Sequence, residues 1–254
     1  MSSAVRGNMT GAGRRLWLAV AVSGLLLGGC TTTLTESHTG GDASGDQVKL
    51  DAKSARVVLM PIDIELFELT AAGLKEPKAD WTGTARVHVT AALTAYLAER
   101  NLGLARYRKP PDPKAVRRDA QLEKLHATVG GTIIVHHYDQ MNRLPTKRGK
   151  MDWTLGSTAR QLGMQQSAEF ALFVFLRDSH ATAGRKAAVV ASSILSIIGT
   201  PRVSAGERVG FASLVDLRTG KVAWFNALYS DSGDMREAKP ARDVIDDLLS
   251  GFPA

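Results

Sequence analysis

The sequence predicts an α/β fold: a single layered domain with a mixed β-sheet and flanking helices. Strand-like runs at residues 55–60 and 169–176 are separated by segments whose apolar residues recur at helical spacing. Helices that connect strands favour parallel neighbours in a sheet. Residues 208–226 instead hold two alternating runs joined by a short turn, and such runs pair antiparallel. The sheet is therefore expected to contain both kinds of pairing.

The first half of the domain is predicted as two strand segments followed by two helices. The run ARVVLM at 55–60 is apolar and partly β-branched, and Pro61 ends it, which predicts a buried strand. The next five residues alternate apolar and acidic, as a half-exposed continuation would. Asp80 can cap a helix with one apolar face, which Asn101–Gly103 ends. A second helix is expected over about 113–126.

The second half is predicted to alternate in the same way. The β-branched run TIIV at 132–135 predicts a strand. Residues 154–166 are expected to form a helix that leads into 169–176, the most strand-like segment of the chain. Gly220 lies between the two runs of the hairpin, where glycine can adopt the positive φ of a tight turn. Apolar residues at helical spacing between 244 and 252 predict a final helix.

The N-terminus has the organisation of an export signal. Residues 1–15 contain three arginines and no acidic residue, and an apolar run from Leu16 to Leu27 follows them. A basic start, a short apolar middle and small residues at the end are typical of such signals. The run is shorter than the about 20 residues that a membrane-spanning helix needs. The pair Arg14-Arg15 leaves both Sec and twin-arginine export open.

Leu27-Gly28-Gly29-Cys30 resembles the lipobox of bacterial lipoproteins. The resemblance implies cleavage after Gly29 and acylation of Cys30, with palmitate among the chains, as the mature N-terminus. Thr31 in the next position resembles lipoproteins that are passed to the outer membrane, so a lipid anchor on its periplasmic face is expected. Cys30 is the only cysteine, so no thiol would remain for an intramolecular disulfide. The alternative is a free cysteine buried in an ordinary helix.

Three parts of the chain follow from this interpretation. Residues 1–29 are the signal peptide, 30–48 hold the lipidated cysteine and a flexible tether, and 49–254 form the α/β periplasmic domain. The stretch TTTLTESHTGGDASGD, 31–46, has a single aliphatic residue and is too polar to compensate the entropy of ordering. The signal peptide holds three of the 32 basic residues and none of the 25 acidic ones, so the mature chain is only mildly basic. No nucleic-acid partner is expected for an exported protein with this charge.

The order of elements carries a second resemblance. With VVLMPIDIELFEL at 57–69 opening the fold and FASLVDLRTGKVAWFN at 211–226 near its end, the chain resembles envelope lipoproteins with a domain similar to the TolB N-terminal domain and the curli-secretion lipoprotein CsgG. The resemblance spans 57–249 in outline and implies the assembly of envelope complexes rather than catalysis. A CsgG-like pore needs long alternating hairpins that face lipid on one side. The sequence holds no pair of segments long enough to supply them.

The sharper catalytic motifs are absent from the sequence: GxSxG, HExxH, the P-loop, GxGxxG and CxxC. Asp63 and Glu65 share one strand face. They could act as an acid/base pair, but the favoured interpretation is two solvated carboxylates. His136 and His137 follow a predicted strand and would point to opposite faces, so they are not expected to share a metal ion. Asp139 lies close to them without a positioned nucleophile. No cofactor and no metal site is therefore expected.

Residues 187–198, AAVVASSILSII, form the most unusual apolar stretch. A helix there would set Val190, Ile194 and Ile198 on one side, and twelve residues are too few to cross a bilayer. A core helix between two strands is the favoured interpretation. The alternative, which we adopt as a hypothesis, is a contact with another subunit or with the membrane interface. A basic stretch between Arg106 and Lys124 could likewise contact anionic lipid headgroups, although a solvated helix face is favoured.

Together these observations favour a lipid-anchored envelope lipoprotein that acts as a non-enzymatic accessory or scaffold in an outer-membrane or periplasmic assembly. Its expected partners are the membrane, through the N-terminal lipid, and other envelope proteins, with a homo-oligomer left open. Two alternatives remain. One is a periplasmic hydrolase that uses the carboxylates or histidines named above, and the other is a subunit of a CsgG-like secretion pore. The sequence identifies neither a partner nor a substrate.

Overall fold

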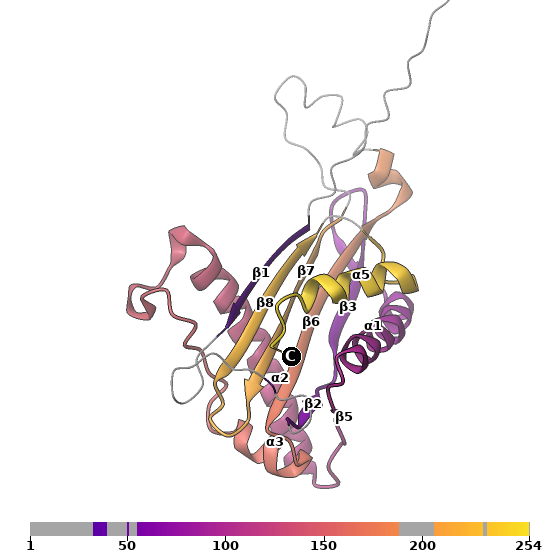
Figure 1. Cartoon of the computed structure of the whole chain (residues 1–254). Coiled ribbons are helices and arrows are strands. Elements are labelled where there is room, and N and C mark those ends of the chain that lie inside the picture. Colours follow the sequence, from indigo (N-terminus) through magenta and orange to yellow (C-terminus); the bar gives the residue numbers. More distant parts are fainter. Residues whose placement is uncertain (1–32, 40–49, 51–54, 188–205, 231–232, 254) are drawn as a thin grey trace, which may run out of the picture. The chain divides into compact units, whose positions relative to one another are not determined.

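The computed structural model describes residues 33–39, 50, 55–187, 206–230 and 233–253. Within them, eight strands form one mixed sheet in the order β1-β8-β7-β6-β2-β5, with β3 beside β6 and β4 beside β3 (Figure 1). The strands are β1 (Thr33–Thr39), β2 (Val57–Leu59), β3 (Asp63–Leu69), β4 (Lys75–Pro77), β5 (Leu104–Arg106), β6 (Phe170–Ala181), β7 (Arg208–Asp216) and β8 (Val222–Ser230). The main helices are α1 (Ala79–Glu99), α2 (Pro113–Ile133), α3 (Ala159–Gln166) and α5 (Ala238–Leu248). The predicted fold class is confirmed.

Strand pairing follows the expected mixture. The central strand β6 pairs parallel with β2 and β3 on one side and antiparallel with β7 on the other, and β2 also pairs parallel with β5. The β7–β8 hairpin is antiparallel, and Gly220 in its turn has φ 76°. A side chain at Gly220 would also collide with the Gly156 carbonyl oxygen, which would lie 2.2 Å from an added Cβ. The turn therefore requires glycine both for its backbone angle and for space.

The sheet carries apolar residues on both faces. On one face, α1 and α5 pack together over a core that includes Val89, Leu93, Trp224 and Ile245. The Tyr96 hydroxyl of α1 donates to the Leu249 carbonyl at 2.7 Å, which ties the two helices to each other. On the other face, residues from α2 and α3 share a second core with aromatic side chains of β6, β7 and β8. Helices thus cover both faces, as a layered α/β domain requires.

Strands β2 and β3 run one after the other along β6, separated by a short break at residues 60–62. Val57 pairs with Phe170, and Asp63 pairs with Phe175. Pro61 lies in the break, where the missing N–H of proline does not interrupt a ladder. On the outer side, β5 pairs with β2 and β4 pairs with β3, and no strand of the described chain pairs with residues 60–66 there. The outer edge of the sheet therefore has a gap at this break.

Residues 33–39 differ from the expectation of a tether. They form β1, an edge strand that pairs antiparallel with β8 from Thr33 opposite Ser230 to Thr39 opposite Trp224. The indole Nε1 of Trp224 donates to the Ser37 hydroxyl at 2.7 Å. The tether was predicted from polar composition, but an edge strand can also be polar. Threonine favours extended backbone even where no hydrophobic pattern indicates a strand.

Two further expectations are corrected. Residues 132–135 are not a strand, because α2 continues to Ile133 and residues Ile134–Tyr138 form a π-helical turn. A short apolar run cannot be assigned to strand or helix from periodicity alone, and here Ile133 is buried by the packing of α2 on the sheet. The helix expected over 154–166 begins only at Ala159, because Thr154 forms a β-bridge with Lys221.

Candidate functional site

One end of the sheet gathers segments that are far apart in the sequence. Strand pairing aligns Thr33 with Ser230, Ser230 with Arg208, and Arg208 with Asp178. At this end, called the Ser230 end below, β1 and β7 begin while β3, β6 and β8 finish. Residues that follow or precede these strands are therefore brought together there, whatever their distance along the chain.

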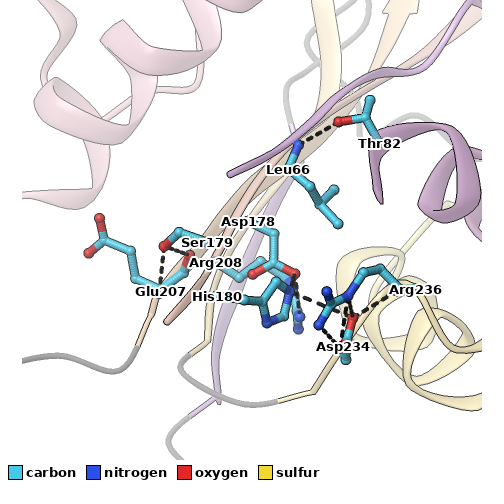
Figure 2. Close-up of polar contacts among 9 residues, drawn as sticks. All are labelled: Leu66, Thr82, Asp178, Ser179, His180, Glu207, Arg208, Asp234 and Arg236. Carbon is cyan, nitrogen blue, oxygen red and sulfur yellow. Dashed lines mark hydrogen bonds and ion pairs between the residues drawn. The ribbon is translucent and has the colours of Figure 1, made fainter. Parts of the chain in front are cut away.

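A group of charged side chains lies at the Ser230 end: Asp178, His180, Arg208, Asp234 and Arg236, here called the charged cluster (Figure 2). Asp178 and His180 are two residues apart on β6 and so share one face of the strand. Arg208 Nη2 lies 2.8 Å from Asp178 Oδ2, and His180 Nε2 donates to the same oxygen at 3.0 Å. His180 Nε2 also lies 3.7 Å from Asp234 Oδ1.

Burial makes the Asp178–Arg208 ion pair the strongest constraint in the cluster. Their side chains are only 4 % and 2 % exposed. A charge taken out of water at such a site is costly unless it is paired and hydrogen-bonded. Two guanidinium nitrogens of Arg208, Nε and Nη2, contact one carboxylate oxygen at 3.3 and 2.8 Å, and His180 adds a further bond to it. Each charge is therefore compensated by a partner that the sheet register fixes.

Asp234 and Arg236 extend the cluster to the chain that follows β8. Asp234 is partly buried, which opposes its ionisation, but hydrogen bonds from the side chain and backbone of Arg236 outweigh this and lower its pKa to about 2. The Arg236 guanidinium lies over the indole ring of Trp81 in α1, 4.1 Å from the ring centroid. The start of α1 is fixed in turn, because the Thr82 hydroxyl accepts a hydrogen bond from the Leu66 backbone N–H at 2.9 Å (Figure 2). The cluster thus joins the sheet to α1.

The cluster does not have the geometry of a hydrolase site. Ser179 is the hydroxyl nearest in sequence to His180, but alternation along β6 places it on the opposite face. Its hydroxyl donates to the Glu207 carbonyl and accepts from the Glu207 N–H, both at 3.1 Å. Within the described chain, no group of three or more His, Cys, Asp or Glu side chains could hold a metal ion. What the cluster can do is fasten the residues that flank β6, β7 and β8 to one another.

An apolar pocket of about 630 Å³ lies beside the Ser230 end, on the face of the sheet covered by α2. Its lining includes Ile134 and Tyr138 from the turn after α2, and Val209 and Tyr229 from β7 and β8. Thr35 of β1 completes one side. Leu74, in the turn between β3 and β4 at the same end of the sheet, is 66 % exposed, and Tyr229 is 44 % exposed. Apolar surface therefore accumulates at this end.

The residues predicted to carry the anchor or to contact another subunit lie outside the described residues. They are Gly29, Cys30, Val190, Ile194 and Ile198. Their predicted roles remain predictions.

Asp63 and Glu65 do share one face of β3, and both face Arg177 of β6. Arg177 Nη2 lies 2.8 Å from Asp63 Oδ1, and Nε lies 3.6 Å from Glu65 Oε2. The guanidinium also stacks on the Phe175 ring at 4.0 Å. An arginine that contacts two carboxylates at once forms an ion-paired network. The arrangement is that of an ion-paired surface.

The histidines near Asp139 are on helical backbone, so strand alternation does not apply to them. His136 is half-buried, and its Nδ1 lies 2.7 Å from the Asn142 carbonyl, while His137 is buried. Asp139 caps the short helix that follows, accepting a bond from the Met141 N–H at 2.9 Å. These contacts assign structural roles to the group.

His126 of α2 is a core residue. Its Nε2 lies 2.7 Å from the Ser213 hydroxyl, and its ring stacks on Phe173 at 4.7 Å. Burial lowers its pKa to about 3, so the ring is neutral at physiological pH. The pair resembles a His–Ser dyad in composition only, because both groups are enclosed and none of the described carboxylates orients the ring.

The basic stretch divides into paired and exposed arginines. Arg118 contacts Asp119 at 2.9 Å and Gln161 at 3.1 Å, so it belongs to a network that joins α2 to α3. The remaining basic residues of the stretch are exposed: Arg106, Arg108, Lys109, Lys114, Arg117 and Lys124. An exposed helix face, the favoured interpretation, describes Lys114, Arg117 and Lys124 on α2. Arg106 instead ends β5, and residues 108–109 lie between β5 and α2.

Sequence reasoning missed the charged cluster. Asp178, Arg208 and Asp234 come from three separate segments, and only the register of β6 against β7 brings the first two together. One signal was available: Arg177-Asp178 directly follows the strand-like run 169–176, and a charge that continues such a strand into the protein requires a partner.

Comparison with known proteins gives no family. No protein-family model matches the chain, and no curated protein matches it. Among solved structures, it is similar to the PelC dodecamer from Paraburkholderia phytofirmans, with 12 % identity and a TM-score of 0.40 over 88 % of this chain and 99 % of that one. A single-substitution variant of that PelC gives 14 % identity and a TM-score of 0.39 over the same shares of the two chains.

The LpoB C-terminal domain from Salmonella enterica is also similar, with 14 % identity and a TM-score of 0.24 over 68 % of this chain and 80 % of that domain. At these identities and TM-scores, none of the three similarities supports an argument about function. Within the described residues, no helix combines the length and apolar character needed to cross a membrane.

Proposed function

We propose that the chain is a lipid-anchored envelope lipoprotein that acts as a non-enzymatic accessory or scaffold on the periplasmic face of the outer membrane. The anchor would be Cys30, exposed as the mature N-terminus by cleavage after Gly29. The single observation that supports this most is the position of β1, which begins at Thr33 at the Ser230 end of the sheet. Only residues 31 and 32 lie between Cys30 and Thr33. The two Cα atoms are three steps apart along the chain and so at most about 11 Å apart.

So short a connection orients the domain on the membrane. With a tether of the length predicted from composition, the domain could present any face to the bilayer. With β1 beginning at Thr33, an anchor at Cys30 would make the Ser230 end the part of the sheet closest to the lipid. Two or three acyl chains would hold the protein there almost permanently, since each buried methylene contributes about 0.8 kcal/mol.

The surface at that end suits contact with apolar partners. Leu74 and Tyr229 are exposed there, and the apolar pocket opens beside Tyr229. Exposed apolar surface of this kind is typical of protein–protein or membrane contact sites. An accessory protein that assembles with envelope proteins, or with further copies of itself, is the function these features favour.

The described residues on either side of segment 187–198 support the same proposal. The Thr182 N–H donates to the Leu69 carbonyl, and the Ser179 N–H donates to the Glu207 carbonyl, both at 3.0 Å. The chain therefore leaves the sheet after β6 and returns before β7 at the Ser230 end. Val190, Ile194 and Ile198 are proposed to contact the membrane interface or a neighbouring subunit there.

The anchor is tested by mass spectrometry of the N-terminal peptide of protein isolated from its native host, together with cell fractionation. We expect a mature chain that starts at Cys30 and carries acyl chains. The Cys30→Ser variant should lose the acyl chains and should no longer be released from its leader at this position, whereas the matched variant Thr31→Ser should be processed normally. An unmodified Cys30 thiol with the leader attached would refute the anchor.

The contact surface is tested separately by a photocrosslinking amino acid placed at Leu74 or Tyr229 in cells. Adducts with envelope proteins or with a second copy of the chain are expected from both positions. Val87 on α1 is 67 % exposed, about as much as Leu74, and provides the control. Equal adduct yields from Val87 would contradict the proposed surface. Ile194→Ser with Ile198→Ser should disperse any assembly while the far-ultraviolet circular dichroism spectrum stays unchanged.

A further inference from the structure

A second cleft lies at the carboxyl ends of β2 and β5, away from the Ser230 end. Its volume is about 410 Å³. The floor is formed by residues 59–62 at the break between β2 and β3, and the walls include Arg86 and Thr90 of α1 and Arg106 and Tyr107 after β5. The gap in the outer edge of the sheet leaves this cleft open, because β5 ends before it and β4 begins beyond it.

The position is one at which open α/β sheets bind ligands. In such sheets, ligands occupy the crevice outside the carboxyl ends of parallel strands, where successive connections leave toward opposite faces. Strands β2 and β5 are parallel neighbours. Helix α1, which precedes β5, packs on one face, and α2, which follows β5, packs on the other. The cleft therefore lies where the chain changes faces.

Two guanidinium groups in the cleft have neutral partners. Arg86 Nη2 donates to the Ile64 carbonyl at 3.3 Å, which holds this side chain over the gap in the sheet. Arg106 Nη2 lies 3.5 Å from the Thr94 hydroxyl. Among the described residues, neither arginine has a carboxylate within ion-pair distance, whereas Arg118, Arg177 and Arg208 each have one. The positive charge in the cleft is therefore not compensated by the fold.

The nearest acidic side chains of the sheet point elsewhere. Ile62 and Ile64 belong to the core under α1, so the alternate residues Asp63 and Glu65 face the side of α2. Both are engaged by Arg177. An anion entering from the outer edge would meet the two guanidinium groups without passing these carboxylates.

We infer that this cleft binds a small oxyanion group, a carboxylate or a phosphate, between Arg86 and Arg106. A guanidinium offers paired N–H donors whose spacing matches the oxygens of either group. Both arginines are exposed, so the binding is moderate and weakened by salt, and the site recognises the charged group of a larger ligand at the edge of the sheet. The inference is independent of the lipid anchor.

The test is a nuclear magnetic resonance titration of the full-length protein in nonionic detergent. Inorganic phosphate and glucuronate are the two probes, and glucose is the neutral control. Saturable shifts of the backbone amides of Ile62 and Tyr107 are expected with at least one anion and none with glucose. Saturation by phosphate alone would indicate a phosphorylated ligand, and saturation by glucuronate alone would indicate a sugar acid. Saturation by both would indicate a site that recognises negative charge in either group. Each of these results supports the inference.

Variants decide whether the two arginines carry the binding. Arg86→Gln and Arg106→Gln should each weaken it roughly tenfold, the effect of losing one charge-assisted hydrogen-bonded contact. Arg117→Gln removes the same charge from an exposed position on α2 outside the cleft and should bind like the wild type. All three should keep the wild-type unfolding temperature. Unchanged affinity in both cleft variants, equal shifts with glucose, or no saturation with either anion at tens of millimolar would overturn the inference.

Discussion

Two adjacent glycines in α2 offer a sharp test of how this helix lies on the sheet. A Cβ added at Gly130 would lie 2.0 Å from Cε2 and 2.4 Å from Cζ of Phe211, far inside van der Waals contact. A Cβ added at Gly131 would meet no atom within 4 Å outside its own helix. The substitutions Gly130→Ala and Gly131→Ala therefore make the same chemical change in the same helix and differ only in what the new methyl group touches.

The magnitudes follow from two opposing effects. Alanine in place of glycine inside a helix stabilises by about 0.5–1 kcal/mol. Overpacking a core costs about 1–3 kcal/mol, and Phe211 has little room to move because it stacks between Phe175 and Phe225 at 4.6 and 5.4 Å. Gly130→Ala should therefore lower the free energy of unfolding by about 1–2 kcal/mol, while Gly131→Ala should raise it by up to about 1 kcal/mol.

The assay is thermal unfolding of the full-length protein, followed by circular dichroism at a helical wavelength. For a domain of this size, 1 kcal/mol moves the midpoint by about 2–4 °C, so the two variants should fall on opposite sides of the wild type. Urea unfolding of the same proteins checks that the denaturant dependence is unchanged. A Gly130→Ala protein that unfolds at or above the wild-type temperature would refute the close approach of α2 to Phe211.

Three further predictions concern buried charge. Burial, followed by the charges of Asp119 and Asp63, raises the pKa of Glu123 to about 7. The folded protein therefore retains a proton that the unfolded chain has lost above about pH 4.5, and stability falls as pH rises through this window. Glu123→Gln should stabilise by about 1 kcal/mol at pH 8 after allowance for partial exposure, and not at pH 4, in urea unfolding at both pH values. The pKa of His126 is lowered to about 3, so below about pH 6.5 the unfolded chain binds a proton that the folded protein does not. The free energy of unfolding should therefore fall as pH decreases from about 6.5, by at most about 1.4 kcal/mol per pH unit. The variant His126→Gln should lose this pH dependence. Arg208→Met should cost about 3–5 kcal/mol in the same assay, and Asp178→Leu in the same chain should restore part of it; additive losses would contradict a direct pair.

Local patterns predicted much of the fold. The apolar run of β6, the two strand-like runs of β7 and β8, and the glycine in their turn are properties of neighbouring residues, so they could be predicted directly. The expected alternation was not found, because β7 and β8 are buried along nearly their whole length. The prediction failed where tertiary packing decides. Residues 132–135 have β-branched side chains, yet they extend α2 and turn after it, because burial of Ile133 against the sheet outweighs local propensity.

The candidate sites divide in the same way. The proposed processing signal Leu27-Gly28-Gly29-Cys30 would be recognised by enzymes as an extended peptide, so a sequence can carry such a signal without any fold. The charged cluster exists only once register places Arg208 opposite Asp178, and the cleft at Arg86 and Arg106 only once β5 ends beside a break in the neighbouring strand. Neither arrangement has a counterpart in residue spacing.

Strand β1 has a practical consequence for anyone who shortens this protein. It pairs with the outer side of β8 from Trp224 to Ser230, which is all but the first two residues of that strand. A chain that starts after residue 39 would expose a row of unsatisfied backbone groups along a strand rich in large apolar side chains, which is a template for edge-to-edge aggregation. Aggregation of such a truncated protein would then result from the loss of β1 as the covering edge strand, and not from low stability of the rest of the domain.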